Sequence, residues 1–131
     1  GIAFAWARLG NVHAMAHPLG GYFDVPHGVA NAVLLPTVLE FNALADTGRY
    51  QTIYEAITGG DGGAAFTPQT LVDEVRRLTA ALGIPQTLSE VGVTAELIPA
   101  MAVDAMKSGN ILVNPRTTSL IQIEDLYRLA L

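Results

Sequence analysis

The stretch from residue 13 to residue 27 reads His13-Ala-Met-Ala-His17-Pro-Leu-Gly-Gly-Tyr-Phe-Asp-Val-Pro-His27 and holds all three histidines of the chain. His13 and His17 are four residues apart, so in a helix both side chains project from the same face. We expect this helix to stop at Pro18-Leu19-Gly20-Gly21, because proline breaks a helix and glycine allows the chain to turn. A turn at Gly20-Gly21 can bring His27 back beside the other two histidines. The sequence therefore predicts a convergent histidine site.

The rest of the chain also reads as helices separated by glycine and proline, and no segment alternates as a strand would. The first helical region covers residues 2–17, with an interruption at Gly10. Thr67-Pro68 and Ser119-Leu-Ile-Gln122 are patterns typical of helix N-termini. Further helices are expected over residues 26–45, with a kink at Pro36, and over 50–58, 67–83, 99–107 and from 119 on. The sequence predicts an all-α, bundle-like fold in one domain, residues 1–131.

The composition excludes several classes of function. Half of the 131 residues are hydrophobic, which is enough for a sizeable core. The net charge of -5 and the lack of a basic cluster give no footprint for nucleic acid or an anionic membrane. There is no cysteine, so disulfides, thiolate metal sites and cysteine nucleophiles are ruled out. We expect a cytoplasmic protein that binds neither nucleic acid nor membrane.

The most apolar stretch, Val29 to Phe41, is interrupted by Asn31, Pro36 and Glu40, and we interpret it as a buried helix rather than a membrane span. The first residues, Gly1 to Trp6, lack the charged segment of a signal peptide. The chain does not begin with Met, and its mean hydropathy is positive at +0.36. Both features suggest a piece of a longer protein whose apolar surface lies in an interface.

Two segments favour structural explanations. Residues 59–63 read Gly-Gly-Asp-Gly-Gly, which predicts a flexible loop. This loop lacks the Lys-Ser/Thr ending of a phosphate-binding loop, and no strand precedes it. The charged residues of the helix that follows Pro68 are expected to form a solvated face: Asp73, Glu74, Arg76 and Arg77.

The histidines themselves indicate a transition metal or a catalytic site, although packing or surface roles remain open at this level. Neutral imidazole suits Zn, Fe, Ni or Cu, whereas Mg²⁺ or Ca²⁺ would need several carboxylates. A zinc protease requires a glutamate directly after the first histidine, and Ala14 stands there. A structural zinc site is not expected without cysteine.

A longer pattern around the histidines resembles a known family. Residues 10–21 and 26–36 resemble the histidine signature of iron-containing, group III alcohol dehydrogenases. The likeness continues through three further motifs, so it covers nearly the whole chain: Gly83-Ile84-Pro85, the Val91-Gly92-Val93 segment with Ile98-Pro99-Ala100, and Asn114-Pro115-Arg116. The resemblance implies the C-terminal, all-helical metal-binding domain of the fold that this family shares with dehydroquinate synthase.

The resemblance also implies a set of roles. In this family Fe²⁺, or Zn²⁺ in its place, is held by an aspartate and a histidine from upstream sequence and by two histidines of the C-terminal domain, which His13 and His27 match. His17 matches an additional histidine beside the metal and nicotinamide that serves proton transfer or substrate orientation. The implied activity is NAD(P)-dependent interconversion of a small alcohol with an aldehyde or ketone. The intact enzyme is expected to be a homo-oligomer.

This chain departs from the family pattern in three ways. Nothing in it resembles the N-terminal nucleotide-binding domain, so NAD or NADP would be bound mainly by residues outside this chain, and no residue here is assigned to it. The upstream aspartate and histidine ligands are absent too, which predicts weak metal binding and no dehydrogenase activity for these residues alone. Phe4-Ala5-Trp6 replaces a more polar segment of many relatives. If the segment from Phe4 to Arg8 approaches the substrate pocket, as the resemblance implies, the bulky Trp6 and the charged Arg8 change its usual polar lining. The other interpretation is that Trp6 packs in the core or against the missing domain, and for Phe4 we expect core packing.

Two other interpretations stay open. Sister activities on the same scaffold share the histidine arrangement, namely lactaldehyde, 1,3-propanediol or maleylacetate reduction and glycerol oxidation. A non-catalytic helical interaction module with vestigial histidines belongs to a different class.

Overall fold

The computed structural model describes residues 1–60 and 65–131, and every regular element within these ranges is helical. The expectation of an all-α fold is therefore confirmed. The α-helices are α1 (Ile2–Ala7), α2 (Gly10–Phe23), α3 (His27–Asn42), α4 (Arg49–Thr58), α5 (Pro68–Ala81), α6 (Ile98–Met106) and α7 (Leu120–Ala130). Short 3₁₀ turns lie at Ala43–Ala45, Ser89–Val91, Ala95–Leu97 and Ile111–Val113. The loop predicted over residues 59–63 falls largely outside the described residues.

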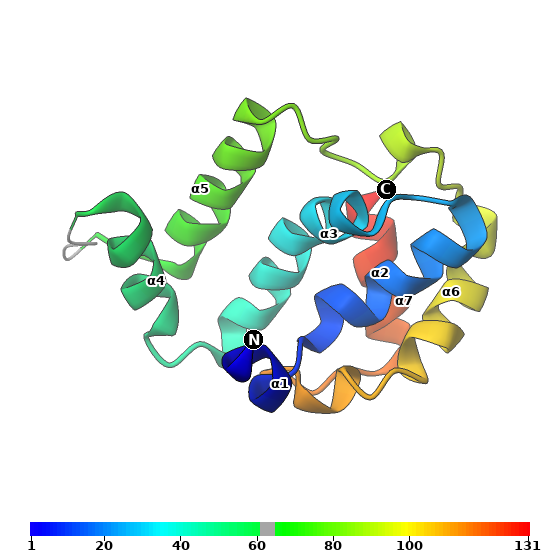
Figure 1. Cartoon of the computed structure of the whole chain (residues 1–131), viewed down its shortest axis with the longest axis horizontal. Coiled ribbons are helices and arrows are strands. Elements are labelled where there is room, and N and C mark those ends of the chain that lie inside the picture. The colour runs from blue at the N-terminus through cyan, green and yellow to red at the C-terminus, as the bar shows by residue number, and fades with distance from the viewer. Residues whose placement is uncertain (61–64) are drawn as a thin grey trace.

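The core lies where α2, α3, α6 and α7 pack against one another (Figure 1). The side chains of Met15, Leu34, Met101 and Ile123, one from each of these helices, are completely buried. Tyr127 on α7 donates its hydroxyl to the carbonyl oxygen of Met15 at 2.6 Å, which satisfies the polar end of the largest buried side chain. These contacts fix α2, the helix that carries two of the histidines.

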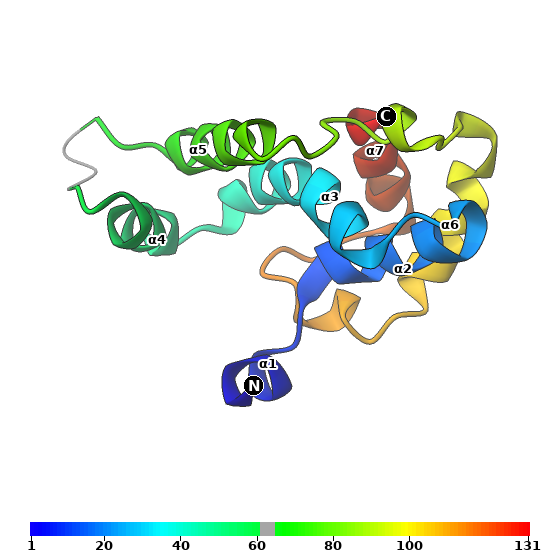
Figure 2. The ribbon, with the colours of Figure 1, turned by 45° about the horizontal axis from the view of Figure 1, so that its top comes forward.

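Two parts extend from this core (Figure 2). The helices α4 and α5 pack on each other, and α5 also contacts α3. The salt bridge from Arg76 to Glu40, at 2.7 Å between Nη2 and Oε2, joins α5 to α3 on the surface. The helix α1 contains no buried residue and projects away from the core. It follows that α1 is held only weakly by the rest of the described chain.

The helix α2 does not end where the sequence predicts. It continues through Pro18 and the two glycines to Phe23, and Asp24 then takes a left-handed conformation with φ 54°. The amide of Asp24 donates to the Gly20 carbonyl, which closes the helix with an αL cap, and the amide of Val25 donates to the Leu19 carbonyl. The burial of Pro18, Leu19 and Val25 outweighs the weak helix propensity of proline and glycine.

The helix α3 passes through the middle of the fold. By length and composition the continuous helical stretch His27–Ala45 could span a membrane. However, α3 contacts α2, α5 and α7, and its Ala30, Leu34 and Val38 side chains are at most 1% exposed. The 33% of this stretch that is buried explains the apolar side chains of its inner face.

The segment before α7 is fixed by polar side chains. Asn114 pairs with Asn42 of α3, and Arg116 donates to the Phe41 carbonyl oxygen at 2.9 Å while its guanidinium lies 3.9 Å above the Phe41 ring. Asn11 of α2 donates to Thr118 at 2.8 Å. The Asn114-Pro115-Arg116 motif therefore ties the C-terminal helix to the two helices that carry the histidines.

Candidate metal centre

The three histidines come together between the middle of α2 and the start of α3. His13 and His17 project from the same face of α2, and their ring centroids are 6.5 Å apart. His27 is the first residue of α3, and its ring lies 5.2 Å from that of His13 and 5.4 Å from that of His17. The turn that returns the chain is made by residues 24–26 rather than by Gly20-Gly21. The predicted convergence is therefore present, although the roles of the three rings remain predictions.

The electrostatics favour a neutral ring at His13. Burial lowers the pKa of His13 first, and the neighbouring His27 and His17 lower it further, because a second positive charge close by is unfavourable. Neutral imidazole is the form that binds a metal ion. His13 is thus held in a state that suits a ligand.

The site is open on one side. His17 and His27 are exposed and His13 is only half-buried. Within residues 1–60 and 65–131, no group of three or more His, Asp or Glu side chains is arranged to hold a metal ion. The donors present fit a divalent transition metal in part: imidazole is a suitable ligand, but a stable site would need further ligands from elsewhere.

A groove of about 470 Å³ adjoins His13. Its walls come from the α1–α2 junction and from α3, and they are mostly apolar: Arg8, Leu9, Val12, His13, Gly28, Asn31, Ala32 and Leu35. Asn31 carries the only side-chain amide in this lining, and its Oδ1 atom is buried without a hydrogen-bond partner among the described residues. A water molecule or a ligand in the groove can donate a hydrogen bond to this oxygen.

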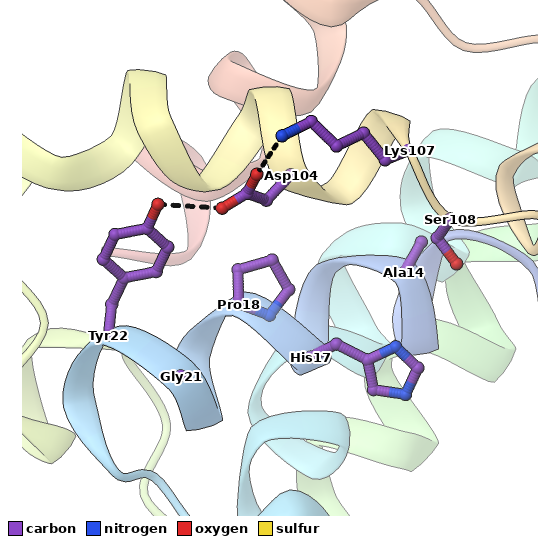
Figure 3. Close-up of a pocket in the computed structure, with 8 residues that line it drawn as sticks. All are labelled: Ala14, His17, Pro18, Gly21, Tyr22, Asp104, Lys107 and Ser108. Atoms are coloured by element: carbon purple, nitrogen blue, oxygen red, sulfur yellow. Dashed lines mark hydrogen bonds and ion pairs between the residues drawn. The ribbon is translucent and has the colours of Figure 1, made fainter.

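A second groove, of about 420 Å³, lies beside His17 between α2 and α6 (Figure 3). Asp104 stands on its wall and accepts hydrogen bonds from the Tyr22 hydroxyl at 2.8 Å and from Lys107 Nζ at 2.7 Å. Lys107 chiefly, and Tyr22 after it, hold the pKa of Asp104 below its usual range. The Asp104 carboxylate thus already accepts two hydrogen bonds. It gives the groove beside His17 a charged wall but no free base.

The histidine pattern alone does not reveal the other polar side chains beside the site, namely Asn31, Asp104 and Lys107. Asn31 is four residues after His27 on α3, which is the spacing of side chains that meet on a helix. Asp104 and Lys107 are about ninety residues from His17, so only the packing of α6 on α2 places them there. No local pattern would have found the second pair.

The aromatic side chains of α1 correct one expectation. Phe4 is 59% exposed and Trp6 85% exposed, so neither packs in the core. The reason is that α1 makes no buried contact, and its junction with α2 is bent sharply at Arg8, which has a positive φ of 56°. Core packing was therefore wrong for both residues, whereas a place for Trp6 against another part of a longer protein remains a prediction.

Comparison with known proteins assigns this arrangement to a family. The C-terminal model of the Fe-containing alcohol dehydrogenase family matches residues 1–131. The chain is 42% identical to the 1,3-propanediol dehydrogenase of Citrobacter freundii over 132 residues, covering 99% of this chain and 34% of the relative. It is 39% identical to the lactaldehyde reductase of Escherichia coli K12, covering 99% of this chain and 35% of that protein.

A solved structure gives the same result. A crystal structure of a 1,3-propanediol oxidoreductase superposes with a TM-score of 0.93 at 42% identity, covering 100% of this chain and 35% of the other. The chain thus belongs to the iron-containing alcohol dehydrogenase family and has the fold of its all-helical C-terminal domain. It spans about a third of the length of the relatives it matches.

Proposed function

We propose that this chain is the C-terminal, metal-binding part of an NAD(P)-dependent alcohol dehydrogenase that interconverts a small alcohol with its aldehyde or ketone. The observation that carries the proposal is the gathering of His13, His17 and His27 within 6.5 Å of one another in a chain of this family. The relatives named for 1,3-propanediol and lactaldehyde support a small polar substrate.

In this proposal His13 and His27 are the two ligands that the chain contributes. A bound divalent iron or zinc ion supplies Lewis-acid polarisation of the substrate oxygen. Burial and the two neighbouring histidines lower the pKa of His13, which favours the neutral form that a metal ligand requires. Residues outside this chain supply the remaining metal ligands and bind most of the nicotinamide cofactor.

His17 has a different role in this scheme. Its ring stacks on that of His27 with an interplanar angle of 20°, and it is exposed toward the groove beside α6. A histidine imidazole can take or give a proton at a ring nitrogen during a reaction. We assign His17 to proton transfer or substrate orientation. The apolar groove beside His13 is suited to hold the carbon chain of a small substrate and to exclude water.

Activity is tested by restoring the missing part. Residues 1–131 would replace the matching third of the Citrobacter freundii 1,3-propanediol dehydrogenase, and NADH-dependent aldehyde reduction would be measured after loading with Fe²⁺. We expect activity in the chimera and none in the 131-residue chain alone. In the chimera, His13→Ala and His27→Ala should lose both bound iron and activity. His17→Ala should keep the iron and lower kcat by about 10²- to 10⁴-fold, as for other proton-transfer groups. A chimera that stays active without iron would contradict the proposal.

A further inference from the structure

Asn31 makes two contacts with His27 across one turn of α3. Its side-chain nitrogen Nδ2 lies 2.9 Å from the His27 carbonyl oxygen and 2.9 Å from Nε2 of the His27 ring. One carboxamide therefore touches both the backbone and the side chain of the same histidine. This places the amide where it can fix the orientation of the ring.

The backbone contact determines which way the amide faces. A carbonyl oxygen can only accept a hydrogen bond, so Asn31 must present its NH₂ group there rather than its oxygen. The same NH₂ group has a second proton to donate, and Nε2 lies within hydrogen-bond distance of its nitrogen. Since a donor faces Nε2, this ring nitrogen must offer its lone pair, and in neutral His27 the ring proton then lies on Nδ1.

The unpaired oxygen of Asn31 fits this orientation. Oδ1 is buried and has no partner among the described residues. Rotating the amide by half a turn would bring Oδ1 against the His27 carbonyl oxygen, and two acceptors would then face each other. The contact to the backbone thus decides the orientation, and the tautomer of His27 follows from it.

We infer that Asn31 is a positioning residue that keeps Nε2 of His27 free of a proton and available to a divalent metal ion. This inference rests on the proposed role of His27 as a ligand. A divalent metal ion held by His27 would use the lone pair of Nε2, and Asn31 would keep its hydrogen bond to the His27 carbonyl. His27 is thereby held ready in the required tautomer before the metal arrives.

Nitrogen NMR of the histidine rings tests this inference on the 131-residue chain. In the metal-free chain, at a pH where His27 is neutral, we expect Nδ1 to give the shift of a protonated nitrogen and Nε2 that of an unprotonated one. Asn31→Leu removes the donor at similar size, and the two shifts should then move toward each other as both tautomers become populated. Addition of Zn²⁺ to the unsubstituted chain should shift His27 Nε2 and the Asn31 side-chain amide protons together.

Asn42→Ala is a matched control. Asn42 lies on the same helix as Asn31, but its side-chain amide donates to Asn114 and not to a histidine. It should lower stability and leave the His27 shifts unchanged. The inference is overturned if the metal-free chain carries its proton on Nε2, a result that needs no variant, or if Asn31→Leu leaves the His27 shifts as they were. If the tautomer follows Asn31 but Zn²⁺ does not affect Nε2, the ligand role of His27 is contradicted, while the orienting role of Asn31 stands.

Discussion

Asn42 and Asn114 form a reciprocal amide pair across the fold, with Nδ2 to Oδ1 distances of 2.8 and 3.1 Å. Asn114 also accepts from the Asn11 backbone amide at 3.2 Å and donates to the Arg116 carbonyl at 2.7 Å. The pair joins the loop before α7 to α3, and through Asn11 to the first turn of α2. Both helices that carry the histidines are therefore anchored to the same side chain.

Removal of the Asn114 side chain should lower the free energy of unfolding more than removal of the Asn42 side chain. Asn114→Ala leaves the Asn11 amide and the Asn42 side chain unpaired in a partly buried place, so we expect a loss of about 3 kcal/mol in the free energy of unfolding. Asn42→Ala keeps the hydrogen bonds of Asn114 to the Asn11 amide and to the Arg116 carbonyl. It should therefore lower the free energy of unfolding by only about 1 kcal/mol. Urea unfolding of both variants checks this order. An equal loss in both would show that the network does not act through Asn114.

The backbone at Gly10 is left-handed, a conformation that favours glycine over residues with a Cβ atom. Its φ is 65°, and a Cβ atom there would lie 3.0 Å from Asn114 Oδ1. Gly10→Ala should therefore destabilise the chain by about 1–3 kcal/mol. Gly21→Ala is the control: Gly21 lies in the same helix, and a Cβ there meets no atom within 4 Å. It should stabilise the chain by about 0.5–1 kcal/mol. Thermal unfolding of the two variants should shift in opposite directions, and a loss in both would contradict the explanation.

The chain should lose stability in alkaline solution. Burial raises the pKa of Tyr50 to about 12, and it raises the pKa of Tyr127 as well. A phenol whose pKa is raised in the folded state stabilises the fold fully below its unfolded pKa of about 10, and this contribution is lost as the pH rises toward the folded value. The free energy of unfolding should thus fall from about pH 10 to pH 12. Tyr50→Phe should lessen this slope, at the expense of the hydrogen bond to the Leu39 carbonyl.

Trp6 reports on the surface around α1. It is the one tryptophan of the chain and is 85% exposed. Its fluorescence in the 131-residue chain should match that of a solvent-exposed indole, and urea should change it little. In the chimera with the relative's remaining two thirds, emission should shift to the blue if another part of the protein covers α1. A blue-shifted emission in the chain alone would show that α1 packs on the core after all.

The local sequence predicts the helices well and their junctions less well. The helix N-termini at Thr67 and Ser119 lie where they were expected, with a proline in the first turn after Thr67 and the predicted capping box at Ser119, because these signals involve residues at most three apart. The end of α2 was placed wrongly, because the burial of Leu19 against other helices overrides the local preference of proline and glycine. His27 returns to His13 as predicted, but through a left-handed Asp24, for which the sequence offers no strong signal. Asp104 reaches the site only through tertiary packing.

Calorimetric titration of Zn²⁺ into the 131-residue chain and its three histidine variants tests the central assignment most directly. We predict weak binding at one site that is reduced about tenfold or more in His13→Ala and His27→Ala and retained within about twofold in His17→Ala. Folding of each variant is checked by its thermal transition. Equal weakening in all three variants, or binding that survives loss of both His13 and His27, would contradict the division of the three histidines into two ligands and one neighbour.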